Sequence, residues 1–460
     1  MTGGLLQLNY IGNQDILLTG NPQITFFKSI YKKYTNFAKQ MFQEKIEGNF
    51  INTPIIEKSY TIKRIGDLLQ EVYIKLKIII TDILINIKII NSKIVINNSI
   101  TILSTDKFYF TVDNIYTNIK SYFIYSLKYD PINYNYNLFN YETNELILID
   151  NDLNMETTIY KQNISSDNND LCTILEEVNI EIGGQIIDTQ YGKWYNIYNQ
   201  FFQKNFNHRF LMCNIKNDFL IQNNNGKRSN FIYIPLHFWF CKSSNLGLPL
   251  IAIKYNNIKL NLKLNNTNSN FKIDEIFLLN NFIFIDDTYR KQFNNTDQDI
   301  LIEQTQYNNG ELFIDKSTFL FEFNHPTKCL FWYMDNAIYS HCKLILNNHI
   351  LFNNTIKYFN LIQPYESNLG HKYIINTQTN QWNKIYPHTS FANNFCMYSF
   401  CLNPLDHQPS GSLNFSKIDR AEFRFINIQK QLNEAKLHIF GINYNVLKIV
   451  NGMCGLLYSI

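Results

Sequence analysis

The residues that could carry out chemistry are few and widely spaced. His341 lies beside Cys342, which is the nearest approach in the chain to a metal site or to a Cys/His nucleophile pair. Adjacent residues of a strand point to opposite faces, so a core Cys beside a surface His is the simpler interpretation. Asp286 and Asp287 are adjacent carboxylates of the kind used in general acid–base catalysis, but they follow an apolar run and fit a solvated strand end better.

The sequence lacks the motifs by which most catalytic and cofactor sites are recognised. It contains no G-x-x-x-x-G-K-[ST], no G-x-G-x-x-G, no H-E-x-x-H and no G-x-S-x-G. The nine histidines do not fall at metal-ligand spacing, and the eight cysteines include no C-x-x-C pair. We therefore expect a protein that is not an enzyme, with no catalytic residues, no metal site, no cofactor, and reduced, mostly buried thiols.

The charge balance argues against a nucleic-acid partner. The chain carries 41 basic and 38 acidic residues, a formal net charge of +3, and charged residues make up only 17% of the total. A protein that coats phosphates needs a strong excess of Lys and Arg. Lys32 and Lys33 lie between Tyr31 and Tyr34, but one basic and aromatic cluster in a nearly neutral chain is weak evidence. We expect no direct contact with nucleic acid.

No segment has the pattern of a signal peptide or a membrane span. The first twenty residues lack a basic region followed by a continuous apolar stretch. The most apolar segment, Ile74–Ile90, is interrupted by charged and polar residues and does not fit a membrane helix. We expect a soluble protein that folds in a reducing compartment.

Apolar residues recur with the period of β-strands along most of the 460 residues. Aromatic side chains make up 15% of the chain, which requires large cores. Strands are predicted at residues 71–80, 177–182, 251–264, 282–285 and 442–450. Many short strands separated by Asn-, Asp- and Gly-rich turns favour sandwiches or barrels.

Helical spacing is limited to two segments. Pro22–Ala38 and Tyr191–Phe206 place apolar residues at intervals of three and four. Residues 82–170 are rich in Asn, Ile and Tyr, and they interrupt two segments that resemble neighbouring strands, which indicates a large surface insertion. Residues 290–299 are polar and lie between strand-rich halves, so they are the best candidate for a linker.

Several sequence blocks, spread over almost the whole chain, occur in a characteristic order. They are Gly3–Ala38, Ile180–Tyr191 (IEIGGQIIDTQY) followed by Trp194, Tyr233–Phe240 (YIPLHFWF), Gly247–Tyr255 (GLPLIAIKY), Phe323–Lys328 (FNHPTK), Gln363–Ser367 (QPYES), Gln408–Asp419 (QPSGSLNFSKID) and Asn443–Ser459 (NYNVLKIVNGMCGLLYS). In this order the blocks resemble the major capsid proteins of nucleocytoplasmic large DNA viruses.

The resemblance implies an all-β protein with two consecutive eight-stranded jelly rolls, known as a double jelly roll. It places an N-terminal arm and helix at residues 1–39, a first jelly roll at 40–292 with the insertion at about 82–170, and a second jelly roll at 300–460. The insertion is expected on the outer face, as part of a tower. The function implied is structural: homotrimeric capsomers of pseudo-hexameric outline tile an icosahedral shell.

The resemblance also implies partners and a location. The protein contacts itself within the trimer and in neighbouring capsomers, and it is found in the virion after synthesis in the host cytoplasm or viral factory. The N-terminal arm, with Leu5, Leu6, Leu8 and Ile11, is expected to contact minor capsid proteins or the side facing the internal membrane. Packing of this arm on its own first jelly roll is the alternative.

Some residues have predicted roles in the jelly rolls. Gly183 and Gly184 suit a tight turn with positive φ between strands. Pro235 suits a strand edge or a bulge, and Trp239 and Phe240 suit a sandwich core. His325, before Pro326, suits a hydrogen-bonded structural position at the start of a strand.

Two other functions remain open. One is a capsid paralogue of low abundance or specialised position, which virion stoichiometry would distinguish. The other is a carbohydrate-binding or cupin-like enzyme, because jelly rolls also carry lectin and metal sites. The cupin alternative requires clustered His and carboxylate ligands, which the sequence does not display.

Overall fold

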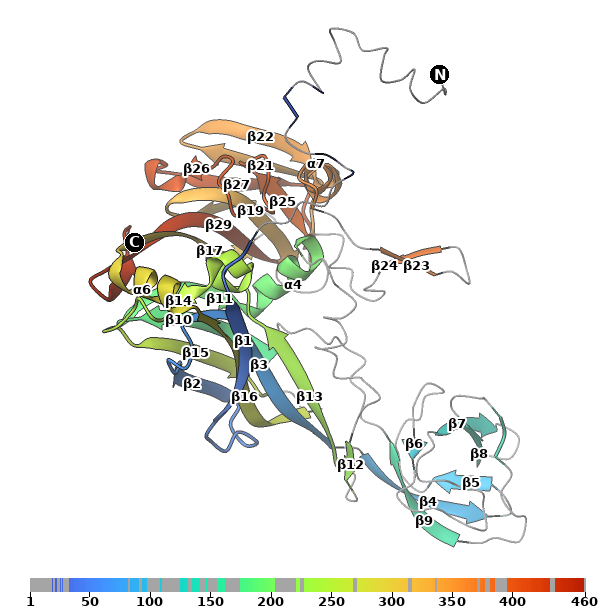
Figure 1. Cartoon of the computed structure of the whole chain (residues 1–460). Coiled ribbons are helices and arrows are strands. Elements are labelled where there is room, and N and C mark those ends of the chain that lie inside the picture. The colour runs from blue at the N-terminus through green and yellow to red at the C-terminus, as the bar shows by residue number, and fades with distance from the viewer. Residues whose placement is uncertain are drawn as a thin grey trace, which may run out of the picture. The chain divides into compact units, whose positions relative to one another are not determined.

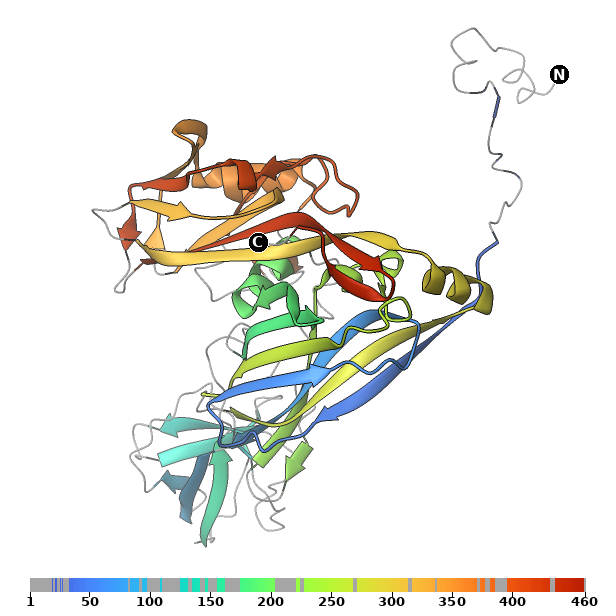
Figure 2. The same cartoon turned by 90° about the vertical axis from the view of Figure 1, so that its left-hand side faces the viewer.

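The computed structural model of the chain describes two β-sandwiches (Figures 1 and 2). The described residues are 33–81, 174–202, 227–267, 271–312, 317–335, 337–369, 395–430 and 435–458, with short segments between 83 and 161, at 221–223 and between 373 and 384, and the single positions 19, 21, 22, 25 and 27. Residues 38–460 cluster into one compact unit, and residues 1–37 form a separate one.

The first sandwich is built from antiparallel strands of the N-terminal half. One sheet contains, in spatial order, β1 (Phe37–Ile46), β16 (Phe271–Ile285), β3 (Leu68–Thr81), β13 (Lys227–Pro235) and β12 (Ile221–Asn223), with β14 (Leu248–Pro249) paired to β3. The facing sheet contains β11 (Gln185–Tyr191), β10 (Leu175–Ile182), β15 (Ile258–Asn265) and β2 (Ile55–Thr61). Side chains at every second position of β3 and β10 are buried, as their alternation predicts.

The second sandwich repeats this plan with the C-terminal half. Its first sheet contains β17 (Gln298–Leu312), β29 (Ala435–Val450), β19 (Pro326–Asp335) and β25 (Cys396–Ser399), with β26 (Leu413–Asn414) on β19 and β30 (Met453–Leu456) on β29. Its second sheet contains β18 (Thr318–Phe321), β27 (Ala421–Ile426), β21 (His341–Leu346) and β22 (His349–Thr355). The short pairs β20 (Ala337–Ile338) with β28 (Gln429–Lys430) and β23 (Tyr373–Asn376) with β24 (Gln381–Lys384) lie outside these sheets. Two consecutive sandwiches confirm the predicted double jelly-roll architecture.

Helices occur mainly where the chain leaves a sheet. Within the described residues they are α4 (Gly192–Phe201), α6 (Asp287–Asn295), α7 (Gln363–Glu366), the π-helix η3 (Tyr358–Ile362) and the 3₁₀ turns η1 (Trp239–Cys241), η2 (Ser244–Leu246) and η5 (Phe415–Lys417). The predicted helix at residues 191–206 is confirmed over its described part, which α4 occupies. Most of the polar linker predicted at residues 290–299 is helical. The helix α6 continues to Asn295, and β17 begins at Gln298. Among the described residues, none of the helices has the length and apolar character to cross a membrane.

The described parts of the predicted insertion form a small closed barrel. Its strands are β4 (Ile83–Ile90), β5 (Lys93–Ile96), β8 (Asn135–Asn140), β7 (Tyr125–Asp130), β6 (Phe108–Tyr109) and β9 (Met155–Lys161). Ile94, Phe108, Leu127 and Leu138 are buried. The segments on either side, β3 and β10, belong to opposite sheets of the first sandwich, so the prediction that they are neighbouring strands is wrong. Between β3 and β10 the chain therefore passes from one sheet of the first sandwich to the other.

Three local predictions need correction. The helix predicted at Pro22–Ala38 lies partly outside the described residues; its described positions 22, 25, 27 and 33–36 are not helical, and its last two residues begin β1, which pairs with β16. The strand predicted at 251–264 starts only at Ile258, because residues 251–257 turn between β14 and β15. The strand predicted around Pro235 ends at that residue, which has no amide hydrogen to continue the ladder. Trp239 and Phe240 follow in η1 and are buried in the core as predicted.

The Gly183–Gly184 turn is confirmed. Gly183 has φ 61° and Gly184 has φ 88°, and the turn pairs Ile182 with Gln185 across β10 and β11. A Cβ on Gly183 would lie 1.9 Å from Nδ2 of Asn256, so space as well as φ requires glycine there.

Candidate functional site at the junction of the two sandwiches

The structure does not bring the sequence-predicted candidates together into a site. Cys342 is buried in β21 while His341, on the other face, contacts the Ser340 hydroxyl at 3.1 Å, so the interpretation as a core Cys beside a surface His is confirmed. Asp286 occupies the N-cap position of α6, and its carboxylate accepts a hydrogen bond from the Thr288 hydroxyl at 2.6 Å. No group of three or more His, Cys, Asp or Glu side chains within the described residues could hold a metal ion.

His325 occupies the start of β19 as predicted, but it is not fully hydrogen-bonded. Its backbone has φ 63°, and its amide donates to the Ser416 hydroxyl at 2.8 Å. The ring is buried, and its Nε2 has no hydrogen-bond partner among the described residues. Burial lowers the pKa of His325, which keeps the ring neutral.

Several buried polar groups lie where the two sandwiches meet. Edge strand β11 of the first sandwich lies beside edge strand β17 of the second. The Asp188 carboxylate accepts a hydrogen bond from the amide of Thr305 at 2.8 Å, and the Gln304 side chain donates to the carbonyl of Ile187. Burial raises the pKa of Asp188 to about 7. The contact between these edges is therefore made by specific hydrogen bonds.

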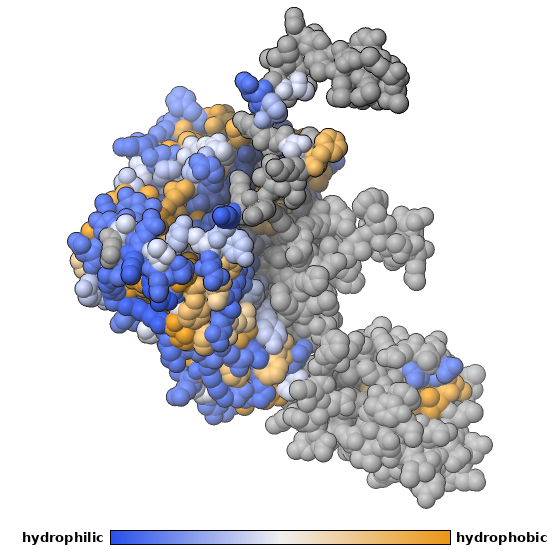
Figure 3. Space-filling model, in the orientation of Figure 1, coloured by the Kyte–Doolittle hydropathy of each residue, from blue (hydrophilic) through white to orange (hydrophobic). Residues whose placement is uncertain are grey.

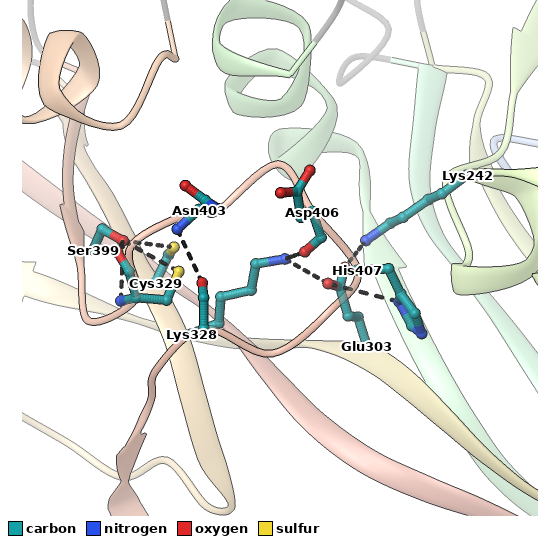
Figure 4. A network of polar contacts seen from close by, with 10 residues as sticks. Lys242, Glu303, Lys328, Cys329, Ser399, Asn403, Asp406 and His407 are labelled. Carbon is teal, nitrogen blue, oxygen red and sulfur yellow. Dashed lines mark hydrogen bonds and ion pairs between the residues drawn. The ribbon is translucent and has the colours of Figure 1, made fainter. Parts of the chain in front are cut away.

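Glu303 is the centre of a buried ion cluster at this junction (Figure 4). Its carboxylate lies 2.5 Å from Nζ of Lys328 on β19 and also pairs with Lys242, which follows η1 in the first sandwich. The Lys328 ammonium donates a second hydrogen bond to the carbonyl of Asp406 at 2.8 Å. The side chains of Glu303 and Lys328 are 5% and 2% exposed, whereas Lys242 is 25% exposed. We call Glu303, Lys242 and Lys328 the Glu303 cluster.

The two lysines hold Glu303 in its charged form. Burial alone raises the pKa of a carboxyl group, but the charges and hydrogen bonds of Lys242 and Lys328 outweigh it and lower the pKa of Glu303 to about 2. His407 lies 4.0 Å from the same carboxylate, and burial lowers its pKa. The cluster therefore joins a fixed negative charge on the second sandwich to a cation from the first.

A second polar cluster surrounds His438, whose side chain is fully buried in β29. Its Nδ1 lies 2.7 Å from the Tyr307 hydroxyl, and its Nε2 lies 2.9 Å from both Asp335 and Nζ of Lys193. Lys193 belongs to α4 of the first sandwich, and the other three residues belong to the second. Burial lowers the pKa of His438, and Lys193 lowers it further against the opposing effect of Asp335. We call these four residues the His438 cluster.

Aromatic packing fills the space around the polar clusters. Trp194 of α4 lies 5.5 Å from the rings of both Phe331 and Phe440, which belong to the second sandwich. Residues of β19 alternate between two apolar clusters: Leu330 and Trp332 face the core of the second sandwich, and Phe331 faces α4. The first sheet of the second sandwich is therefore covered on both faces.

The C-terminal strands extend this covering into the first core. Leu447, Ile449 and Cys454 belong to the same apolar cluster as β3 and β10, together with Ile302 of β17. A chain segment that is last in sequence thus completes a core made by the N-terminal half. Such an arrangement can support rigid assembly of the two sandwiches.

Sequence reasoning missed the junction, although one signal pointed to it. Residues 329–334 (CLFWYM) are continuously apolar in the sequence, and the structure buries residues 437–445 without alternation although they include His438, Asn443 and Asn445. Continuous burial is typical of strands that are covered on both faces. The polar residues of the junction, such as Glu303 and His438, give no such signal in the sequence, because their partners lie far away along the chain.

Two family models match the chain. The model described as "Major capsid protein N-terminus" matches residues 25–160 and 147–300, and the model described as "Large eukaryotic DNA virus major capsid protein" matches residues 336–455. Together these matches cover both sandwiches. The chain belongs to the major capsid protein family of large eukaryotic DNA viruses.

Relatives of this capsid protein align along its whole length. The major capsid protein of Pyramimonas orientalis virus is 29% identical, and that of Paramecium bursaria Chlorella virus 1 is 28% identical, each alignment covering 100% of both chains. Among solved structures, the PBCV-1 virus capsid chain has 22% identity and a TM-score of 0.62 over 95% of this chain and 100% of its own. The Faustovirus major capsid protein has 10% identity and a TM-score of 0.57 over 96% of this chain and 94% of its own. These structures share the double jelly-roll fold, and this capsid protein is a structural component of the virion.

Proposed function

We propose that the capsid protein acts as a homotrimer of pseudo-hexameric outline and that these trimers tile an icosahedral shell. The observation that carries the proposal is the junction: two similar sandwiches are locked into one unit by buried ions, hydrogen bonds and aromatic packing. Two rigid, similar sandwiches per chain supply six similar blocks per trimer, which suits a hexagonal footprint. A closed ring of heterologous contacts requires no covalent chemistry.

An exposed apolar surface supports contact with a further copy. Leu361, Ile362 and Tyr365 on η3 and α7 are 50%, 47% and 82% exposed in the single chain. Figure 3 shows apolar residues around α7 on the same face. We call these three residues the α7 patch and propose that a neighbouring subunit covers it.

The trimer is tested with purified full-length protein by light scattering and electron microscopy. We expect threefold particles with a hexagonal outline. Ile362→Asp places a charge in the α7 patch and should shift the protein from trimer to monomer. Leu320→Asp is the matched control. Leu320 is 57% exposed on β18, which forms the edge of its sheet opposite to β22, the strand that leads into η3. Monomeric wild-type protein would refute the trimer, and equal effects of the two variants would refute the role of the α7 patch.

We further propose the domain limits and partners that the resemblance implied. Residues 1–39 form an arm that contacts minor capsid proteins or the membrane side of the shell. Residues 40–292 form the first jelly roll, and residues 300–460 form the second. The protein is synthesised in the host cytoplasm or viral factory. The position of α6 between β16 and β17 supports a limit between the two jelly rolls near residue 295. No catalytic activity and no nucleic-acid contact are part of this proposal.

Deletion of residues 1–25 tests the arm. We expect the truncated protein to form the same trimers in solution, because both sandwiches lie outside the deleted segment. Its incorporation into shells should fall, as measured by the amount of truncated protein in purified particles when it competes with the full-length chain. Equal incorporation of the two forms would argue against an arm that binds other shell components.

A further inference from the structure

Two cysteines that are far apart in sequence meet at a single hydroxyl group beside the junction. Cys329 lies in β19, opposite Ser399 of β25, and Cys401 follows two residues after Ser399. The Ser399 Oγ atom lies 3.6 Å from the sulfur of Cys329 and 3.4 Å from the sulfur of Cys401. Figure 4 shows Cys329 and Ser399 turned toward each other next to Lys328.

The surroundings of this pair combine burial with a nearby cation. Cys329 is fully buried and Cys401 is 8% exposed, and both belong to the apolar cluster around α4. Lys328 precedes Cys329 and is itself 2% exposed. A positive charge in a poorly solvated environment stabilises a thiolate.

We propose that Cys329 and Cys401 form a redox-active thiol pair that a peroxide converts into a disulfide. In the first step the Cys401 thiolate attacks one peroxide oxygen: an S–O bond forms, the O–O bond breaks, and the leaving hydroxide takes a proton to become water. In the second step the Cys329 sulfur attacks the sulfenic acid: an S–S bond forms, and the displaced hydroxide takes the Cys329 proton to become a second water. The two sulfurs lose two electrons, and the peroxide gains them.

The electrostatics of the pair fit this order of events. A hydrogen bond with Cys329, opposed by burial and assisted by Ser399 and Lys328, lowers the pKa of Cys401 to about 6. Burial raises the pKa of Cys329 well above its ordinary value, and its interaction with Cys401 raises it further. Cys401 is therefore the nucleophile, and Cys329 keeps its proton until the second step.

The disulfide would connect β19 to the segment that covers the Glu303 cluster. That segment, residues 401–410, contains Asp406, whose carbonyl accepts the hydrogen bond from Lys328. The disulfide would therefore hold residues 401–410 in place over the Glu303 cluster. The expected consequence is a higher melting temperature of the oxidised protein, measured against the reduced protein at the same pH.

Hydrogen peroxide treatment of the full-length protein, followed by peptide mapping, tests the proposal. We expect a Cys329–Cys401 linked peptide with a loss of about 2 Da, for two hydrogen atoms. Cys401→Ser should abolish the product, and Cys329→Ser should leave a sulfenic acid at Cys401 that dimedone traps. Cys454 is the matched internal control, because it is also 8% exposed but burial raises its pKa to about 12.

The pH dependence of the wild-type reaction gives a readout that needs no variant to fold. With a pKa of about 6 for Cys401, the rate should be nearly constant above pH 7 and roughly tenfold lower at pH 5 than at pH 7.5. Absence of the linked peptide, oxidation of Cys454 at the same rate as Cys401, or a rate that keeps rising steeply from pH 7 to pH 9 would overturn the proposal.

Discussion

The two polar clusters at the junction join the same pair of sandwiches by different electrostatics. The Glu303 cluster contains a permanent ion pair that is almost completely buried, and its exposed cation comes from the first sandwich. In the His438 cluster the fully buried member is a neutral ring, and Lys193 is 40% exposed. A buried charge is costly to leave without a partner, whereas a neutral ring responds to pH. We infer that the first cluster determines how stable the junction is and that the second, together with Asp188, determines how its stability varies near neutral pH.

The largest expected effect is that of Glu303→Gln. The change leaves the Lys328 ammonium buried without a counter-charge, which should lower the free energy of unfolding by about 3–5 kcal/mol. Denaturant unfolding of the purified protein measures this loss. The double variant Glu303→Leu with Lys328→Met removes the two almost fully buried charges and leaves only Lys242, which is 25% exposed and can be solvated, so it should lie within about 2 kcal/mol of the wild type. If the double variant is the less stable of the two, the buried ion pair is not the reason for the loss.

Acid titration of the same proteins sharpens this result. The folded-state pKa of Glu303, about 2, lies below the ordinary value of 4.5. The unfolded chain therefore binds the proton first, and the contribution of Glu303 is complete above pH 4.5 and disappears as the pH falls to about 2. We expect the double variant to lose less stability than the wild type over that interval. Stability curves of the wild type and the double variant that run parallel over this pH interval would contradict the assignment of the acid-induced loss to Glu303.

An intermediate effect is expected for His438→Gln. The substitution removes a fully buried ring that contacts Tyr307 and Asp335, at a cost of about 1–3 kcal/mol at pH 7. The pKa of His438 is lowered from 6.5, so the unfolded state takes up the proton first, and the wild type should lose stability as the pH falls below 6.5. The variant should lose less between pH 7 and pH 5, as measured by denaturant unfolding at each pH. His325 and His407, whose pKa values are also lowered, keep their contributions in both proteins.

The smallest effect should come from Lys193→Met. Lys193 is 40% exposed, so its ion pair with Asp335 is screened by solvent and should contribute at most about 1 kcal/mol. Lys259→Met is the matched control: Lys259 is also 40% exposed, and it pairs with Glu181 on the four-stranded sheet of the first sandwich. Thermal or denaturant unfolding of the two variants should give similar small changes. A loss for Lys193→Met as large as that for His438→Gln would mean that the second cluster also depends on its charges.

The sequence by itself determined the class of the fold and much of its local structure. Alternation in β3 and β10, helical spacing in α4 and the Gly183–Gly184 turn could all be predicted, because each depends on neighbours within a few residues. The ordered blocks along the chain identified the family for the same reason: each block is a local pattern.

Only the tertiary structure decided which distant residues meet. Glu303 acquires its partners from residues 242 and 328, and His438 from residues 193, 307 and 335. Cys329 and Cys401 meet only because β19 pairs with β25. Strand order and register are set by the burial of whole sheets, which no local pattern specifies, and the properties of a buried charge or thiol depend on what that packing places around it.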